Sequence, residues 1–201
     1  MNLNQKSWQR CQRLLAAAES SQVSSQRTEN GGQVVDCGVH SPGGLAAGVA
    51  LAEICLADLG TVVIGPADPQ LWDGQAVTVA TDEPLWACMA SQYAGWKISV
   101  GDYFAMGSGP MRAAYAGEDL FKELDYQEQA TNIVGVLESG QLPSAEVCGQ
   151  IAQDCRVEVS DVTLLVAPTA SLAGTVQVVA RSLETALHKM HVLGFDLTSV
   201  V

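Results

Sequence analysis

Hydrophobic positions recur along this chain at two spacings, which indicates that helices and strands alternate. Near the start, Trp8, Cys11, Leu15 and Ala18 follow one another at three- and four-residue steps, so the pattern predicts a first helix over residues 3–18 with one apolar face. Pro143 and Ser144 form a typical helix start. Further helices are predicted over residues 43–59, 83–95, 117–124, 144–155 and 174–191.

Short runs rich in Val, Ile and Thr predict the strands. They cover residues 61–65, 75–81, 97–101, 131–139, 163–168 and 195–201, and a strand through Val34 and Val35 follows a hairpin turn at Asn30-Gly31. Because the two element types alternate along the whole length, the sequence predicts an α/β fold of mixed sheets with packed helices. No linker or repeat divides the chain, so residues 1–201 are treated as one unit.

The last predicted helix has two distinct faces. The apolar residues are predicted to form its core face: Val176, Val179, Leu183, Ala186 and Met190. The polar residues fall on the opposite side: Gln177, Arg181, Glu184 and His188. This polar side is either a solvated face with an ion pair of about 0.2–0.5 kcal/mol, or the wall of a cleft in which a carboxylate acts as general base and a guanidinium orients it.

Two apolar strands are each followed by a segment of small residues, "GDYFAMGSGP" and "APTASLAGT". Ligands of open α/β proteins bind at the carboxyl ends of strands, where exposed glycine N–H groups bond carbonyls or anions. The alternative is a tight strand–helix turn. Asp102 either orients a bound group or caps such a turn. Neither segment matches a Walker loop or a dinucleotide fingerprint, although a phosphate-binding enzyme stays an open alternative.

Composition narrows the possible functions. The 201 residues carry a net charge of −12, which repels phosphate backbones and argues against nucleic-acid binding. No apolar run is long enough for a membrane span, and the first residues lack a signal-peptide core, so a soluble cytoplasmic protein is expected. The six cysteines show no CxxC pair and no zinc-finger spacing with a histidine, so we expect buried, reduced thiols and no metal site; a catalytic thiol is the less favoured alternative, because no partner histidine can be named for it.

Five blocks of sequence carry a specific resemblance. They are "ENGGQVVDCGV", "AEICL", "AGWKISVGDYFAMGSGPMRA", "LESGQLPSAEV" and "LLVAPTASLAGTVQVVARSLETALHKM". In this order and over most of the chain, they resemble methenyltetrahydromethanopterin cyclohydrolases. The combination of "GDxFAMGSGPxRA" with "LLVAPTASL" is the most specific part of the match.

The resemblance implies an activity and an architecture. Family members reversibly hydrolyse the cyclic N5,N10-methenyl cation of tetrahydromethanopterin to the N5-formyl compound, in the one-carbon metabolism of methanogenesis and formaldehyde oxidation. They need no metal or redox cofactor, bind the pterin in a cleft between two α/β lobes, and form homo-oligomers, commonly trimers. Because family members continue beyond the position of Val201, the second lobe is expected to be incomplete here. A non-catalytic pterin-binding or assembly protein is therefore the alternative.

The resemblance also assigns roles to residues. The catalytic Arg-x-x-Glu pair of the family falls on Arg181 and Glu184, where the arginine is expected to hold the carboxylate and depress its pKa. The pterin pocket is expected to include residues from both small-residue segments: Gly101, Asp102, Phe104, Gly107, Ser108, Gly109, Pro110, Thr169 and Ser171.

Overall fold

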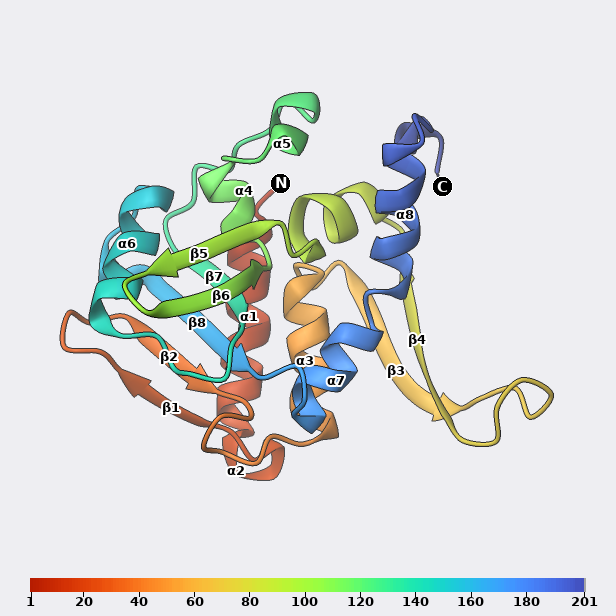
Figure 1. The fold of residues 1–201 in the computed structure, drawn as a ribbon, viewed down its shortest axis with the longest axis horizontal. Coiled ribbons are helices and arrows are strands. Elements are labelled where there is room, and N and C mark those ends of the chain that lie inside the picture. Colours follow the sequence, from red (N-terminus) through yellow and green to blue (C-terminus); the bar gives the residue numbers. More distant parts are fainter. Residues whose placement is uncertain (201) are drawn as a thin grey trace.

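The computed structural model describes residues 1–200 and is built around a six-stranded mixed sheet (Figure 1). The order across the sheet is β1 (Ser24–Arg27), β2 (Gln33–Asp36), β8 (Val162–Ala167), β7 (Ile133–Glu138), β6 (Tyr103–Ser108) and β5 (Trp96–Val100). The central strands β2, β8 and β7 run parallel, whereas β1 at one edge and β6 and β5 at the other are antiparallel to their neighbours. The sequence-based prediction of a mixed α/β fold is confirmed.

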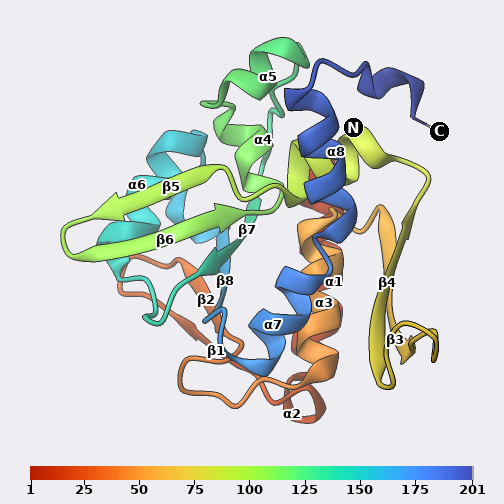
Figure 2. The same cartoon turned by 45° about the vertical axis from the view of Figure 1, so that its right-hand side comes forward.

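Helices cover both faces of this sheet (Figures 1 and 2). On one face lie α1 (Leu3–Ala16) and α3 (Leu45–Cys55), and on the other lies α6 (Ala145–Cys155). The remaining helical segments are α2 (Ala18–Ser21), η1 (Leu85–Gln92, a π-helix), α4 (Met111–Tyr115), α5 (Asp119–Glu123), η2 (Val159–Asp161), α7 (Leu172–Val179), α8 (Ser182–Val192) and η3 (Leu197–Ser199). Every residue of β8 is buried, because helices pack on both sides of that strand.

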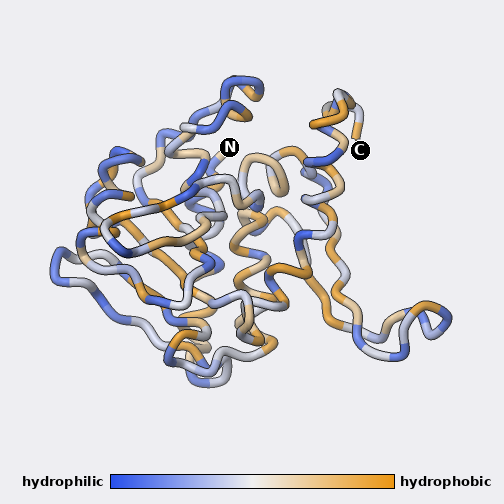
Figure 3. The backbone as a smooth tube through the Cα atoms, viewed as in Figure 1, coloured by the Kyte–Doolittle hydropathy of each residue, from blue (hydrophilic) through white to orange (hydrophobic). Residues whose placement is uncertain are grey.

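A separate two-stranded sheet, β3 (Gly60–Pro66) and β4 (Gln75–Thr81), extends away from the main sheet as a hairpin. Its strands are hydrophobic along most of their length (Figure 3). Val62 packs with Leu56 at the end of α3, Met89 of η1 and Leu187 of α8 in a distinct core cluster. This cluster fixes α8 against η1, which positions the candidate site.

The small-residue helix α3 packs closely against α7. A Cβ on Gly48 would lie 2.6 Å from the Cβ of Val176, so the two helices approach closer than larger residues allow.

All six cysteines are buried free thiols, as the sequence predicted. Within residues 1–200, no helix is both long and apolar enough to cross a membrane. The division into two lobes stays a prediction.

Three sequence-based predictions about local structure are wrong. The segment over residues 101–113, in which exposed glycine backbone was expected, instead forms β6, the strand next to the edge strand β5, and then α4, with Gly101 in the β5–β6 turn. The long last helix is two helices that bend at Ala180 and Arg181. The predicted strand over residues 195–201 contains the 3-10 helix η3, whose Leu197 is buried in the core beside α8; Val201 lies outside the described residues.

The bend between α7 and α8 also changes which residues are buried. Val179 and Ala186, predicted for the core face, are exposed, whereas Gln177 and Glu184 of the predicted polar face are buried. A single helical period over residues 174–191 cannot describe this arrangement, because the bend shifts the phase of the second helix relative to the first.

Candidate functional site

Polar side chains are buried where α7 and α8 meet β6, β7 and η1. We call this group the polar cluster, and it consists of Gln92, Ser108, Glu138, Gln177, Arg181 and Glu184. The Ser108 hydroxyl donates to the Gln92 carbonyl oxygen at 2.6 Å, and the Gln92 amide donates to the Ala180 carbonyl oxygen at 3.2 Å. These bonds join β6 and η1 to the bend that carries Arg181.

Glu184 has an unusual environment for a carboxylate. It lies in the first turn of α8 and is only 4% exposed. Burial raises its pKa from the ordinary 4.5 to about 7, although Arg181 and Arg112 both act to lower it. Among the side chains that the structure describes, none forms a hydrogen bond to this carboxylate. A carboxyl group that titrates near neutral pH suits proton transfer.

Arg181 pairs with a different acid from the one predicted. Its Nη2 atom lies 2.6 Å from Oε1 of Glu138, the last residue of β7, and both side chains are largely buried. The prediction that Arg181 holds the Glu184 carboxylate directly is therefore wrong, whereas the predicted lowering of the Glu184 pKa by Arg181 is present but smaller than the effect of burial. The helix bend directs the guanidinium toward the sheet, and the cost of burying Glu184 outweighs the attraction of the nearby cations.

Several polar atoms of the cluster have no hydrogen-bond partner within residues 1–200. They are Gln92 Oε1 and Arg181 Nε, and also Glu138 Oε1 and Arg181 Nη2, which form no hydrogen bond but lie 2.6 Å apart as an ion pair. Unpartnered buried polar atoms cost free energy and are uncommon in folded proteins. A bound molecule with both donor and acceptor groups would satisfy them.

The carboxyl ends of the three parallel strands lie at one edge of the sheet, beside the cluster. Ser171 follows β8 and caps α7: its Oγ accepts from the Gly174 N–H at 3.1 Å and donates to the Pro168 carbonyl oxygen at 2.8 Å. Thr169, in the same connection, is exposed. The structure therefore gives Ser171 a local structural role, and both residues remain predicted pocket residues.

Asp36, at the end of β2, organises the next loop at this edge. Its two carboxylate oxygens accept four backbone N–H bonds from residues 38–41, at 2.7–3.0 Å. Burial pushes the pKa of Asp36 upward, but the backbone hydrogen bonds outweigh that effect and the pKa is lowered.

We expect Asp36→Asn to reduce the free energy of unfolding by roughly 2–4 kcal/mol, because an amide NH₂ would face two of the four N–H donors. Urea denaturation measures this change, with Asp102→Asn at the exposed β5–β6 turn as the control. Because the folded pKa of Asp36 lies below the ordinary 3.8, its stabilisation is present above that pH and is lost on further acidification. An equally small effect of both variants would contradict this role.

The residues of the glycine-rich segment do not gather at one place. Gly101 and Asp102 are exposed at the β5–β6 turn, and Phe104 is an exposed side chain on β6. In contrast, residues 107–110 are all buried, and a Cβ on Gly107 would lie 2.8 Å from Met111 and 2.9 Å from Ile98. Gly107 therefore serves close packing of β6 against α4, and Ser108 is the one residue of the segment in the polar cluster.

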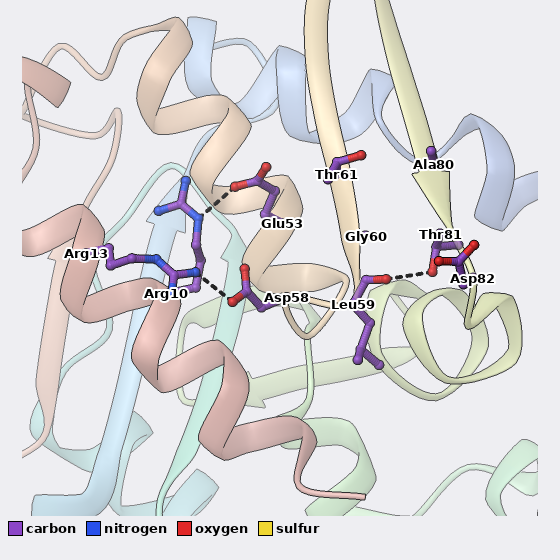
Figure 4. A pocket seen from close by; sticks show the side chains of 10 residues that line it. All are labelled: Arg10, Arg13, Glu53, Asp58, Leu59, Gly60, Thr61, Ala80, Thr81 and Asp82. Atoms are coloured by element: carbon purple, nitrogen blue, oxygen red, sulfur yellow. Dashed lines mark hydrogen bonds and ion pairs between the residues drawn. The ribbon is translucent and has the colours of Figure 1, made fainter.

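Several hollows lie outside the polar cluster, and two of them are large. The larger, about 780 Å³, lies between α1, the end of α3 and the β3–β4 sheet (Figure 4). Its arginines are already paired, Arg10 with Glu53 at 2.7 Å and Arg13 with Asp58 at 2.6 Å. The smaller, about 460 Å³, lies between α5 and α8 and is lined in part by Tyr93 and His188, whose rings stack at 4.6 Å.

Sequence reasoning missed two charged residues. Glu138 ends an apolar strand within the quoted block "LESGQLPSAEV", and Arg112 lies within "GPMRA". A charged residue at the end of a buried strand is a usable signal for Glu138. Arg112 occupies the arginine position of the "GDxFAMGSGPxRA" motif, but the residue order alone does not show that it is buried, because an arginine after glycine and proline resembles an exposed helix start. Within residues 1–200, no group of His, Cys, Asp and Glu side chains could hold a metal ion; that the reaction needs no cofactor stays a prediction.

Comparison with known proteins adds independent information. A sequence model of the Cyclohydrolase (MCH) family matches residues 2–201. A methenyltetrahydromethanopterin cyclohydrolase of Methanococcoides burtonii is 42% identical over 201 residues, covering 100% of this chain and 63% of the relative. Proteins of the same name from Xanthobacter autotrophicus and Rhodopirellula baltica are 47% and 49% identical, covering 93% and 85% of this chain and 56% and 52% of the relatives. The chain thus spans between about half and two thirds of the length of these relatives.

Proposed function

Because this chain belongs to the methenyltetrahydromethanopterin cyclohydrolase family, we propose that it hydrolyses the N5,N10-methenyl-tetrahydromethanopterin cation to N5-formyl-tetrahydromethanopterin, reversibly. The family name of the relatives supports the substrate. The structural observation that carries the proposal is the buried carboxyl group of Glu184, whose pKa is raised to about 7 beside two arginines.

The chemistry requires little beyond an activated, positioned water. The substrate carbon lies between two nitrogens that share a positive charge, so it is already electrophilic. In our proposal the ionised Glu184 accepts a proton from water as the oxygen bonds to this carbon. The C–N10 bond then breaks, N10 takes up a proton, and the hydroxyl proton is lost as the formyl C=O forms. One proton is released overall, and no oxidant, reductant or metal enters the balance.

Arg181 has a separate role in this proposal. Its Nε atom, which lacks a hydrogen-bond partner within the described residues, donates to the oxygen that adds to the substrate carbon. The ion pair with Glu138 keeps the guanidinium in place. Donors aimed at a developing charge in a largely dry site stabilise it strongly.

The remaining proposals follow the family resemblance. We propose a cytoplasmic homo-oligomer, trimeric as the resemblance implies, which acts in the one-carbon metabolism of methanogenesis or formaldehyde oxidation. Because the comparison covers about half to two thirds of each relative, a protein that binds the pterin without turning it over is the second candidate. Mixing the purified chain with the methenyl substrate separates the two: loss of methenyl absorbance supports the enzyme, and binding without that loss supports the second candidate.

The initial rate of hydrolysis should rise with pH through about 7. Glu184 can accept a proton only when ionised, so the fraction of active enzyme falls below its pKa. Initial rates measured at saturating substrate on both sides of pH 7 check this expectation, after correction for the uncatalysed reaction. A flat profile across this range would contradict the assignment of Glu184 as the base.

A further inference from the structure

Arg112 is a fully buried cation with an unusually complete set of partners. Its side chain has 0% exposure. Nε and Nη2 donate to the two carboxylate oxygens of Glu118, each at 2.7 Å, and Nη1 donates to the carbonyl oxygens of Met89 and Ser91 at 3.1 and 3.2 Å. The two carbonyls belong to the last turn of the π-helix η1. Arg112 therefore caps η1 and fixes the segment before α5 at the same time.

Aromatic rings enclose the same guanidinium. Its central carbon lies 5.0 Å from the ring centroid of Tyr93 and 5.3 Å from that of Phe121, within the range of cation–π attraction. Tyr93 in turn stacks on His188 of α8. The contacts of Arg112 thus reach η1, the α4–α5 segment and, through Tyr93, the helix that carries Glu184.

The charges around Glu184 can be assigned to the elements packed against it. Arg112, on α4, and Arg181, directly before α8, each act to lower the pKa of Glu184. Cys88 belongs to η1, and the charge of Glu184 contributes to the raised pKa of its thiol. Glu118 and Glu138 are the acids paired with the two arginines. His188 lies one turn further along α8.

We propose that Arg112 is a positioning residue, which holds η1, the α4–α5 segment and α8 in register and supplies a fixed buried positive charge to Glu184. It acts on the reaction through Glu184 and makes no contact with substrate in this proposal. The catalytic part of the inference rests on the proposed function, but the effect on Glu184 does not.

The physical reason is that no solvent can replace this cation. In a water-excluded site, removing a fixed charge is not compensated by hydration of the carboxylate, so the electrostatic effect of Arg112 on Glu184 is lost in full. Lysine would keep the charge but could not satisfy a bidentate carboxylate and two carbonyls in one plane.

The first test measures the protonation of Glu184 without substrate. Protein labelled with ¹³C at the glutamate carboxyl is titrated by NMR, and the Glu184 signal is the one that is absent in Glu184→Gln. We expect Arg112→Met to raise the pKa of Glu184 by about one unit, and Glu118→Gln, which removes a nearby negative charge, to lower it. If Arg112 had a purely structural role, the two variants would not change the pKa of Glu184 in opposite directions. An unchanged Glu184 pKa in Arg112→Met overturns the proposal.

The double variant Arg112→Met/Glu118→Gln covers the case in which Arg112→Met does not fold. It leaves no buried charge unpaired, and its Glu184 pKa should still be raised because Arg112 is the partner that acts on Glu184. An unchanged pKa in the folded double variant would equally overturn the proposal.

The second test follows catalysis. In Arg112→Met or the double variant, the pH dependence of kcat should move upward together with the pKa of Glu184, with KM changed less than kcat. Arg10 also pairs with a glutamate, Glu53, but lies outside the polar cluster, so Arg10→Met is the control and should leave the pH dependence of kcat unchanged. If the wild-type chain shows no turnover, the proposed function fails while the NMR result still decides the role of Arg112; turnover with an unshifted profile overturns only the positioning role.

Discussion

Replacing Glu184 with glutamine should reduce kcat for methenyl hydrolysis by about 10²- to 10⁴-fold, the usual contribution of a positioned general base. The amide has nearly the same shape, so the fold and pterin binding should be retained, but it cannot accept the water proton. Loss of methenyl absorbance gives the rate, and fluorescence titration gives substrate affinity. Glu123 is an exposed glutamate that pairs with His191, so Glu123→Gln is the matched control and should leave kcat unchanged.

The same variant has a second, independent signature in stability. In the folded protein the pKa of Glu184 is raised from 4.5 to about 7, so between these values the folded state binds more protons than the unfolded state. Stability therefore falls as pH rises through this window. Glu184→Gln removes that loss and should make the protein at least as stable as the wild type at pH 8. Near-normal turnover in Glu184→Gln would refute the role of Glu184 as the base. A Glu184→Gln variant that is less stable than the wild type at every pH would contradict the conclusion that burying the ionised Glu184 side chain costs stability.

Replacing Arg181 with alanine should reduce kcat by about 10²- to 10³-fold, because it removes the Nε donor aimed at the developing charge and a cation that lowers the pKa of Glu184. The pH profile should also shift upward. Glu138 would lose its partner, so a loss of roughly 1–3 kcal/mol in the free energy of unfolding is expected.

A matched control separates the two effects of Arg181→Ala. Arg10 pairs with Glu53 at 2.7 Å with side-chain exposures of 16% and 18%, close to the 13% and 15% of Arg181 and Glu138. Arg10→Ala should therefore cost similar stability without changing kcat. Urea denaturation and initial rates measured on both variants decide the matter. Equal rates in the two variants would reduce the Arg181–Glu138 pair to a structural contact.

Local spacing predicted most elements of this fold but failed where two elements meet. The apolar run at β8 and the amphipathic start of α1 depend on nearby residues, and both predictions are confirmed. The bend at Arg181 was missed, because the apolar spacing of residues 174–191 is compatible with one continuous helix. At the bend, the Ala180 carbonyl oxygen accepts a hydrogen bond from Gln92 of η1 and Arg181 pairs with Glu138 of β7, and periodicity does not record such contacts.

The glycine-rich segment shows the same limit in another form. Glycine next to serine and proline predicts backbone exposed to a ligand, yet residues 107–110 are buried. Glycine allows close approach of any neighbour, whether a ligand or another element of the same chain. Here the neighbours of Gly107 are Met111 and Ile98, and only the packed structure identifies them.

The sequence by itself determined the alternation of helices and strands, the family and the two residues proposed for catalysis, because periodicity and motifs are properties of residue order. Only the tertiary structure decided that Arg181 pairs with Glu138 and that Arg112, far away in sequence, acts to lower the pKa of Glu184. It also decided that the pKa of Glu184 is raised. Partners distant in sequence and the loss of surrounding water arise when the elements pack together, and these two effects set the energy of a buried charge.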